Sequence, residues 1–217
     1  GSTWNQLGNS INGDNPFDFS GRSVSLSYDG DVVAIGATWN DGNGDKSGQI
    51  RVFEWDGSNW SKRGSDIYGE SALDISGFSA SLSNDGNTLA IGAIDNADGG
   101  DYSGQVRVYN WSAGSWGQVA GDINGEGAGD RSGWKVSISG DGSALAIGAP
   151  ENDGAGADAG HVRVFKMLTL SQVDISKDSE LAVELISSVI DQVATHRASY
   201  GALQNRLEYT VSNLINV

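Results

Sequence analysis

Acidic residues recur at near-alternate positions in the glycine-rich loops of this sequence and could hold a cation. Asp41, Asn43 and Asp45 show this pattern, and carboxylate and amide oxygens are ligands that Ca²⁺ prefers. The acids of the two later loops are displaced from this pattern: Asp95, Asp98 and Asp101, then Glu151, Asp153 and Asp158. Because a shared metal site would fix the register, the sequence favours solvated turns, with a weak calcium site as the alternative.

Other catalytic chemistry has little support. The chain contains no cysteine, and its two histidines, His161 and His196, lie far apart without a nucleophile and acid arranged around them. We therefore expect a protein that is not an enzyme and has no cofactor beyond that calcium. The net charge of −15 disfavours nucleic acid as a partner, and no apolar run is long enough to insert into a membrane.

One period of 56 residues relates three copies of a unit without a gap. It aligns tryptophans, aspartates, glycines and arginines, among them Trp4, Trp60 and Trp116; Asp18, Asp74 and Asp130; Gly36, Gly92 and Gly148; and Arg51, Arg107 and Arg163. We expect the aspartates to cap their own turns and the arginines to pair with those aspartates. For the tryptophans, packing between sheets is favoured over a carbohydrate-stacking ring.

Each unit has the pattern of short antiparallel strands. Residues 23–27 alternate, Asp29-Gly30 suits a tight hairpin, residues 32–37 form a buried small-residue strand, and residues 49–55 form the next strand. A further strand near Trp60 makes four strands per unit, which is typical of a propeller blade. The predicted blades span about 4–59, 60–115 and 116–166.

The phase of the repeat bears on how the module closes. The sequence begins with an outer strand at Trp4 and ends with a blade of only three strands. Three blades are fewer than the usual four to eight. Pairing with another chain and a compact threefold arrangement are both open.

These segments resemble a known repeat. The stretches Ser20–Ser27, Ala34–Ala37 and Ser47–Phe53 resemble the FG-GAP type of β-propeller repeat, over about residues 4–166. The calcium loop of that family is here replaced by a short Asp-Gly hairpin. The resemblance implies a β-propeller in a secreted or cell-surface protein.

After Lys166 the pattern changes from period two to period 3.6. We expect a linker over 167–175 and a long helix over 176–217, whose apolar stripe packs on another helix. The predicted fold class is thus mainly β with a long C-terminal α-helix. The expected oligomer or filament contacts are Leu185, Val189, Val193, Arg197, Tyr200, Gln204, Asn205, Arg206, Leu207, Val211 and Leu214.

The second half of this tail resembles another family. Residues 193–214, with the run Gln204-Asn-Arg-Leu-Glu208, are similar to the carboxy-terminal core helix of bacterial flagellins. The resemblance implies a self-assembling subunit of the extracellular bacterial flagellum, with the β-module as its outer domain. It also implies flagellar export partners and an innate immune receptor as further partners.

Two alternatives stay open. A secreted binding or adhesion module could use the tail to oligomerise, or the chain could be an engineered fusion of the two parts. In each case we expect the chain to associate with itself, through the tail and possibly through blade closure.

Overall fold

The structure is a computed structural model that describes residues 2–167, 183, 186–187 and 190. The chain divides into two units, Gly1–Met167 and Leu168–Val217. The described part contains thirteen strands and no helix long and apolar enough to cross a membrane.

The first unit of the repeat folds into one twisted antiparallel sheet. Strands β1 (Ser20–Leu26), β2 (Val32–Ala37) and β3 (Gln49–Trp55) lie side by side in chain order. The outer edge of β3 pairs with two short strands, β4 (Trp60–Lys62) and β5 (Ile67–Tyr68). The predicted fourth strand is therefore present in two pieces.

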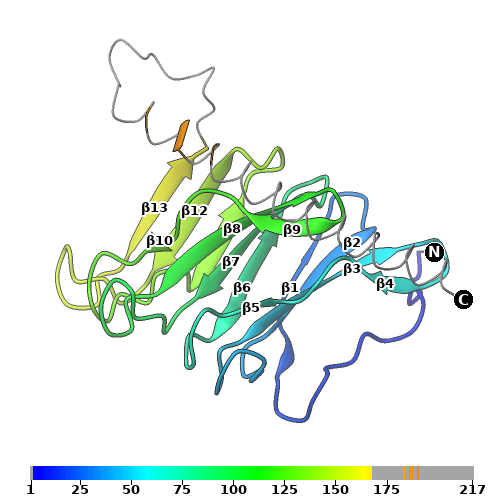
Figure 1. The fold of residues 1–217 in the computed structure, drawn as a ribbon, viewed down its shortest axis with the longest axis horizontal. Coiled ribbons are helices and arrows are strands. Elements are labelled where there is room, and N and C mark those ends of the chain that lie inside the picture. Colours follow the sequence, from blue (N-terminus) through cyan, green and yellow to red (C-terminus); the bar gives the residue numbers. More distant parts are fainter. Residues whose placement is uncertain (1, 168–182, 184–185, 188–189, 191–217) are drawn as a thin grey trace, which may run out of the picture. The chain divides into compact units, whose positions relative to one another are not determined.

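The next two units repeat this arrangement (Figure 1). The second sheet contains β6 (Ser76–Leu82), β7 (Thr88–Ala93), β8 (Gln105–Ser112), β9 (Ser115–Gln118) and β10 (Ile123–Asn124). The third contains only β11 (Lys135–Ile138), β12 (Ala144–Ala149) and β13 (His161–Lys166). The 56-residue period, the propeller-like blades and the three-stranded last blade are confirmed. We call these sheets blades 1, 2 and 3.

The hairpin at Asp29-Gly30 is confirmed in all three blades. Gly30, Gly86 and Gly142 have positive φ angles of 82°, 66° and 73°, which glycine adopts without steric cost. In blade 3 the Ser139 hydroxyl donates to Asp141 at 2.6 Å and accepts from the Ala144 amide at 2.9 Å. At the turn, these hydrogen bonds take the place of the backbone hydrogen bonds that join the two strands.

The core lies between the blades rather than inside one sheet. Ile50 and Val52 of blade 1 pack against Leu89 and Ile91 of blade 2, and Val106 of blade 2 belongs to a similar cluster with blade 3. Close approach requires glycine: a Cβ on Gly36 or Gly92 would overlap the backbone carbonyl of Gly77 or Gly133 in the next blade. The continuous apolar strands β2 and β7 are buried because neighbouring strands and blades cover them.

Two expectations about the ends of the chain are wrong. Residues 2–19 form no strand, and Trp4 is fully exposed instead of lying in an outer strand. The fold class with a long C-terminal α-helix is also wrong, because the elements formed by the residues that the structure describes are all β-strands. Of the predicted helix the structure describes only residues 183, 186–187 and 190, where Val183, Ile186 and Ile190 have helical backbone and exposed side chains; the rest of it lies outside the described residues.

Candidate functional site

The recurring arginines lie between blades and bind acids other than the predicted ones. Arg51 Nη1 lies 2.7 Å from Asp14 Oδ1, Arg107 Nη1 lies 3.7 Å from Glu70 Oε1, and Arg163 Nη1 lies 4.0 Å from Glu126 Oε1. Each arginine also donates a hydrogen bond of 2.7 Å to a backbone carbonyl of the segment that precedes its own blade. Arg51 donates to Asn12, Arg107 to Tyr68 and Arg163 to Asn124. The expected pairs with Asp18, Asp74 and Asp130 are therefore wrong.

Those three aspartates cap turns, as predicted. Asp74 Oδ2 accepts the backbone amides of Glu70 and Ser71 at 2.9 Å, and Asp130 Oδ2 accepts that of Gly127 at 2.9 Å. An asparagine side chain from the following loop donates a further hydrogen bond to each carboxylate. In one of them, Asn96 Nδ2 donates to Asp74 Oδ1 at 3.2 Å. Their acceptor capacity is used by these donors, so the arginines bind the acid four residues earlier.

Three carboxylates gather at the loop end of blade 2. One oxygen each of Glu70, Asp98 and Asp122 lies within 4.8 Å of the other two, and all three residues are exposed. The buried Gln105 amide donates to Glu70 at 3.1 Å and to Asp98 at 3.0 Å. Three negative charges thus face one another with Arg107 as the nearby cation. A possible cation-binding cluster is therefore present.

The cluster depends on a substitution between repeats. The residue equivalent to Asp98 is Gly42 in blade 1 and Gly154 in blade 3. In blade 1, a Cβ on Gly42 would overlap the ring of Tyr68. In blade 2, the residues equivalent to this pair are Asp98 and Asn124. The smaller neighbour leaves space for a third acid in blade 2.

The other predicted cation ligands take part in loop structure. Asp41 Oδ1 accepts the Lys46 amide at 2.8 Å, and Asn43 Nδ2 donates to the carbonyls of Gly69 and Glu70. Burial raises the pKa of Asp95, an effect that Arg131 at 3.8 Å opposes. Asp45 and Asp101 use their backbone carbonyls to bind the next loop, at Leu73 and Gly129. Only Asp98 of the six enters the carboxylate cluster.

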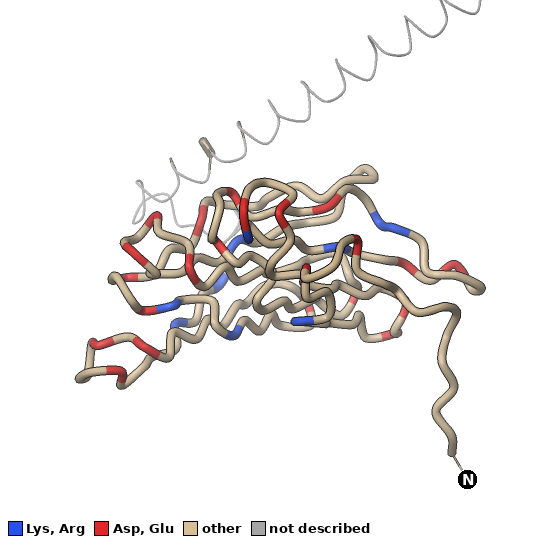
Figure 2. Tube along the Cα trace, turned by 90° about the horizontal axis from the view of Figure 1, so that it is seen from below, with Lys and Arg blue, Asp and Glu red and all other residues tan. Residues whose placement is uncertain are grey.

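Among the described residues, acidic positions lie mainly in the turns and loops outside the strands; they are red along the tube in Figure 2. Sequence reasoning missed Glu70 and Asp122, because they come from segments 28 residues before and 24 residues after Asp98. The alternation of polar residues within one loop carries no signal for acids from other segments, such as Glu70 after β5 or Asp122 before β10. All eleven predicted tail contacts, Leu185 to Leu214, lie outside the described residues.

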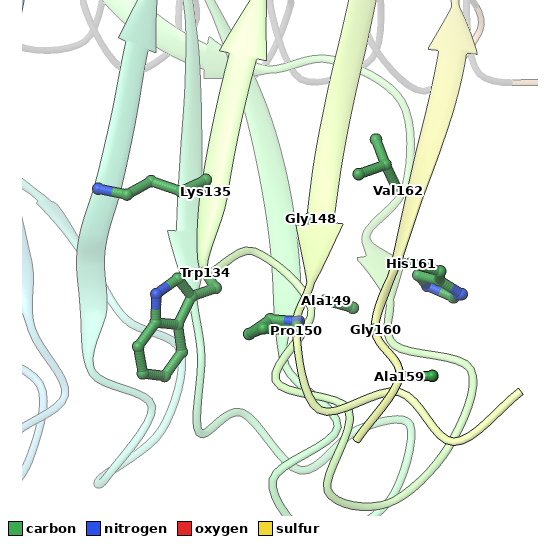
Figure 3. Close-up of a pocket in the computed structure, with 9 residues that line it drawn as sticks. All are labelled: Trp134, Lys135, Gly148, Ala149, Pro150, Ala159, Gly160, His161 and Val162. Atoms are coloured by element: carbon green, nitrogen blue, oxygen red, sulfur yellow. The ribbon is translucent and has the colours of Figure 1, made fainter. Parts of the chain in front are cut away.

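The outer face of blade 3 holds a cavity of about 470 Å³. Trp134 and Lys135 line it from the start of β11, Gly148 and Pro150 from the end of β12, and His161 and Val162 from the start of β13 (Figure 3). In the interior of the stack, the corresponding face of each blade is filled by the next blade. The cavity is thus the uncovered half of an interface between blades.

The sequence comparisons agree with the repeat. The FG-GAP repeat matches residues 12–53 and 119–165, which confirms that resemblance for these two stretches. The family comparison gives no flagellin match, so the resemblance of residues 193–214 has no support from it. No curated protein matches the chain.

Several solved structures match the chain at low similarity. A Bacteroides uniformis protein assigned as a 6-phosphogluconolactonase has 15% identity and a TM-score of 0.47, over 70% of this chain and 38% of that one. The periplasmic gluconolactonase of Pseudomonas aeruginosa has 16% identity and a TM-score of 0.42, over 73% and 40%. Sqt1 of Saccharomyces cerevisiae has 17% identity and a TM-score of 0.43, over 75% of this chain and 36% of that one. The chain therefore spans about two fifths of the length of these structures.

The fold and the matches define a class: the chain carries a stack of propeller-like blades that includes FG-GAP repeats.

Proposed function

We propose that the chain is part of a subunit of an extracellular bacterial filament of the flagellin type, with the blades as its outer domain. The supporting observation is the run Gln204-Asn-Arg-Leu-Glu208 in a tail whose composition differs from that of the blades. The division of the chain after Met167 agrees with a β-module joined to a separate assembly segment. In this proposal the blades have a structural role without catalysis.

The charge of the chain fits such an outer position. Acids outnumber basic residues by 28 to 13, and among the described residues they lie mainly in the turns and loops outside the strands (Figure 2). A surface with a strong net charge of one sign favours solubility. The export partners and immune receptor implied by the flagellin resemblance stay predictions, as does the flagellar location.

The filament proposal is tested in cells that express the natural gene. Antibodies raised against the exposed loops of blade 2 should decorate extracellular filaments in immunogold electron microscopy. Leu207→Asp, which puts a charge into the predicted contact set, should abolish the filaments. Gly117→Ala, at an exposed position with free space around it, should leave them intact. Label confined to the cell body, or filaments unchanged by Leu207→Asp, would contradict the proposal.

A second candidate function is weak calcium binding by a secreted binding module. The observation that favours it is the carboxylate cluster of Glu70, Asp98 and Asp122, since clustered carboxylates suit Ca²⁺. Isothermal titration with CaCl₂ should show one weak site per chain, and Asp98→Gly, which copies blades 1 and 3, should remove it. Equal heats of calcium binding for the wild-type chain and Asp98→Gly would count against this function.

A further inference from the structure

The two ends of the blade stack expose the two halves of an interface that the chain already uses twice. On the outer face of blade 1, Val24 and Leu26 are 65% and 58% exposed. On the outer face of blade 3, Val162 and Val164 are 68% and 73% exposed. Their counterparts on blade 2, Val106 and Val108, are 0% and 9% exposed because blade 3 covers them. Among the described strands β1–β13, large apolar side chains are thus exposed only on the two end blades.

The N-terminal arm, residues 4–12, lies against blade 1 in the position that the outer strand of an adjacent blade would take. Trp60 Nε1 donates to the Leu7 carbonyl at 3.1 Å, as Trp116 Nε1 donates to that of Arg63 at 2.9 Å. Arg51 reaches the carbonyl of Asn12 as Arg107 reaches that of Tyr68, in both cases at 2.7 Å. The arm therefore lies against blade 1 as β4 and β5 lie against blade 2.

Blade 3 lacks the element that the arm supplies. In blades 1 and 2 the third strand pairs with an outer strand, and the tryptophan pairs Trp55–Trp60 and Trp111–Trp116 lie with ring centroids 5.4 Å apart. Among residues 2–167, β13 pairs only with β12. Blade 1 and blade 3 lie at opposite ends of the stack (Figure 1), so the arm does not reach blade 3 of its own chain.

We propose that the blade 3 end of one chain binds the blade 1 end and arm of a second copy, head to tail. In blade 1, residues 53–55 of β3 pair with residues 62–60 of β4. By the 56-residue repeat, the equivalent of 53–55 in blade 3 is 165–167, and the equivalent of 62–60 in the arm is 6–4. Phe165, Lys166 and Met167 would therefore lie opposite Gln6, Asn5 and Trp4 of the second copy. Closed propellers contain about four to eight blades, so two copies close one ring of six blades. Such a contact joins different surfaces of two identical chains and is complete when the ring closes.

Contacts at this interface follow those inside the chain. The Arg22 guanidinium lies 3.9 Å from the ring centroid of Phe78, which packs on Trp134 with 4.9 Å between the centroids. The half-buried Trp134 ring, which already has Arg131 5.9 Å from its centroid, would then receive Arg22 of the second copy in the same cation–π arrangement. Lys135 stands at the register position of Ser23 and Ser79, whose hydroxyls donate to Gly77 and Gly133, and its ammonium keeps a donor there.

This inference concerns the β-module and does not depend on the filament proposal. Any association through the tail would involve other residues, so the two are separable by variants. Leu207→Asp should leave the paired blades intact, and variants at Gly148 should leave tail contacts intact.

A steric variant tests the pairing without harming the single chain. A Cβ on Gly148 has free space in one chain, with only the Lys135 carbonyl at 3.8 Å, but in the pair it would meet the Gly21 carbonyl of the second copy. Light scattering of the full chain carrying Leu207→Asp, which removes the predicted tail contacts, should give twice the 22.6 kDa chain mass. Overpacking should raise the dissociation constant of Gly148→Ala by about tenfold or more, with unchanged circular dichroism.

Gly117→Ala is the matched control, because a methyl there also meets free space and lies away from both end faces. It should keep the wild-type mass. A wild-type chain that stays monomeric at high concentration, or a Gly148→Ala chain that pairs as well as wild type, would overturn the proposal.

Cross-linking tests the register and the closed ring. The chain has no native cysteine among its 217 residues, so Asn5→Cys with Lys166→Cys introduces a defined pair. Oxidation of the full chain should give one covalent dimer with two disulfides. The control, Glu54→Cys with Ser61→Cys, carries the equivalent pair inside blade 1 and should close within one chain.

Three outcomes of the cross-linking contradict the closed pair. A ladder of larger products means an open head-to-tail chain instead of a ring. A disulfide inside one chain means closure of a single copy, and the absence of any cross-link, while the control forms, means that the arm does not meet β13.

Discussion

Replacement of Gly92 by alanine should destabilise the β-module, while the same change at Gly148 should not. Gly92 lies in β7 outside the positive-φ region, so alanine can adopt its backbone conformation. The added methyl would overlap the Gly133 carbonyl of blade 3 and displace the Ser79 hydroxyl that donates to this carbonyl at 2.7 Å. The cost thus comes from the contact between two blades.

The magnitude follows from three contributions. Overpacking of a close contact costs about 1–3 kcal/mol, and loss of the hydroxyl bond costs about 1 kcal/mol. The lower entropy of the unfolded alanine chain returns about 0.4–1 kcal/mol. The net loss of about 1–3.6 kcal/mol corresponds to a decrease of roughly 2–14 °C in the unfolding midpoint for a chain of this size.

Thermal unfolding followed by circular dichroism measures the effect, at a protein concentration at which the chains are monomeric. Gly148→Ala is the control, since only the entropic contribution applies there and its midpoint should stay equal or rise slightly. Equal decreases for both variants would refute the argument, because they would show that the loss of glycine in the strand, and not contact with the next blade, determines the stability.

Three further predictions concern polar groups. Hydrogen bonds from two serine hydroxyls and a backbone amide lower the pKa of Asp141 from 3.8 to about 2, so its stabilising effect is present above pH 3.8 and lost as the pH falls toward 2. Asp141→Asn should therefore weaken the dependence of the unfolding midpoint on pH in this range. Arg107→Met should lower the free energy of unfolding in urea by about 1.5–3 kcal/mol, because the Tyr68 carbonyl loses its charged donor; a smaller loss would mean that water replaces it. Asp74→Ala should cost at least about 2 kcal/mol by leaving two amides and the Asn96 side chain without an acceptor, and proteolysis should then begin in that loop.

The strands were predictable because one sequence pattern is repeated. The segments 32–37 and 49–55 match β2 and β3 to the residue, since each is bounded by glycine-rich turns and faces a neighbouring blade. The outer strand was harder to define, because a bend at Gly64-Ser65, where Gly64 has a φ of 84°, divides it into β4 and β5. Period and alternation identify the sheet but not such an interruption.

Side-chain partners across blades were less predictable. The arginine partners Asp14, Glu70 and Glu126 differ in type between copies, whereas the identical Asp18, Asp74 and Asp130 attracted the wrong assignment. Identity across the copies identified turn-capping residues, because a cap needs one geometry. An ion pair tolerates either acid, since a longer side chain can still reach the guanidinium.

The phase of the repeat connects the fold with its association. Among residues 2–167, an outer-strand equivalent lies before β1, and β13 pairs only with β12. The Leu7 and Asn12 carbonyls already hold the arm against blade 1. Because the arm is prepositioned, a second copy would lose less conformational entropy on binding than it would with a free segment. The exposed valines of blade 3 therefore meet an end that is arranged to receive them.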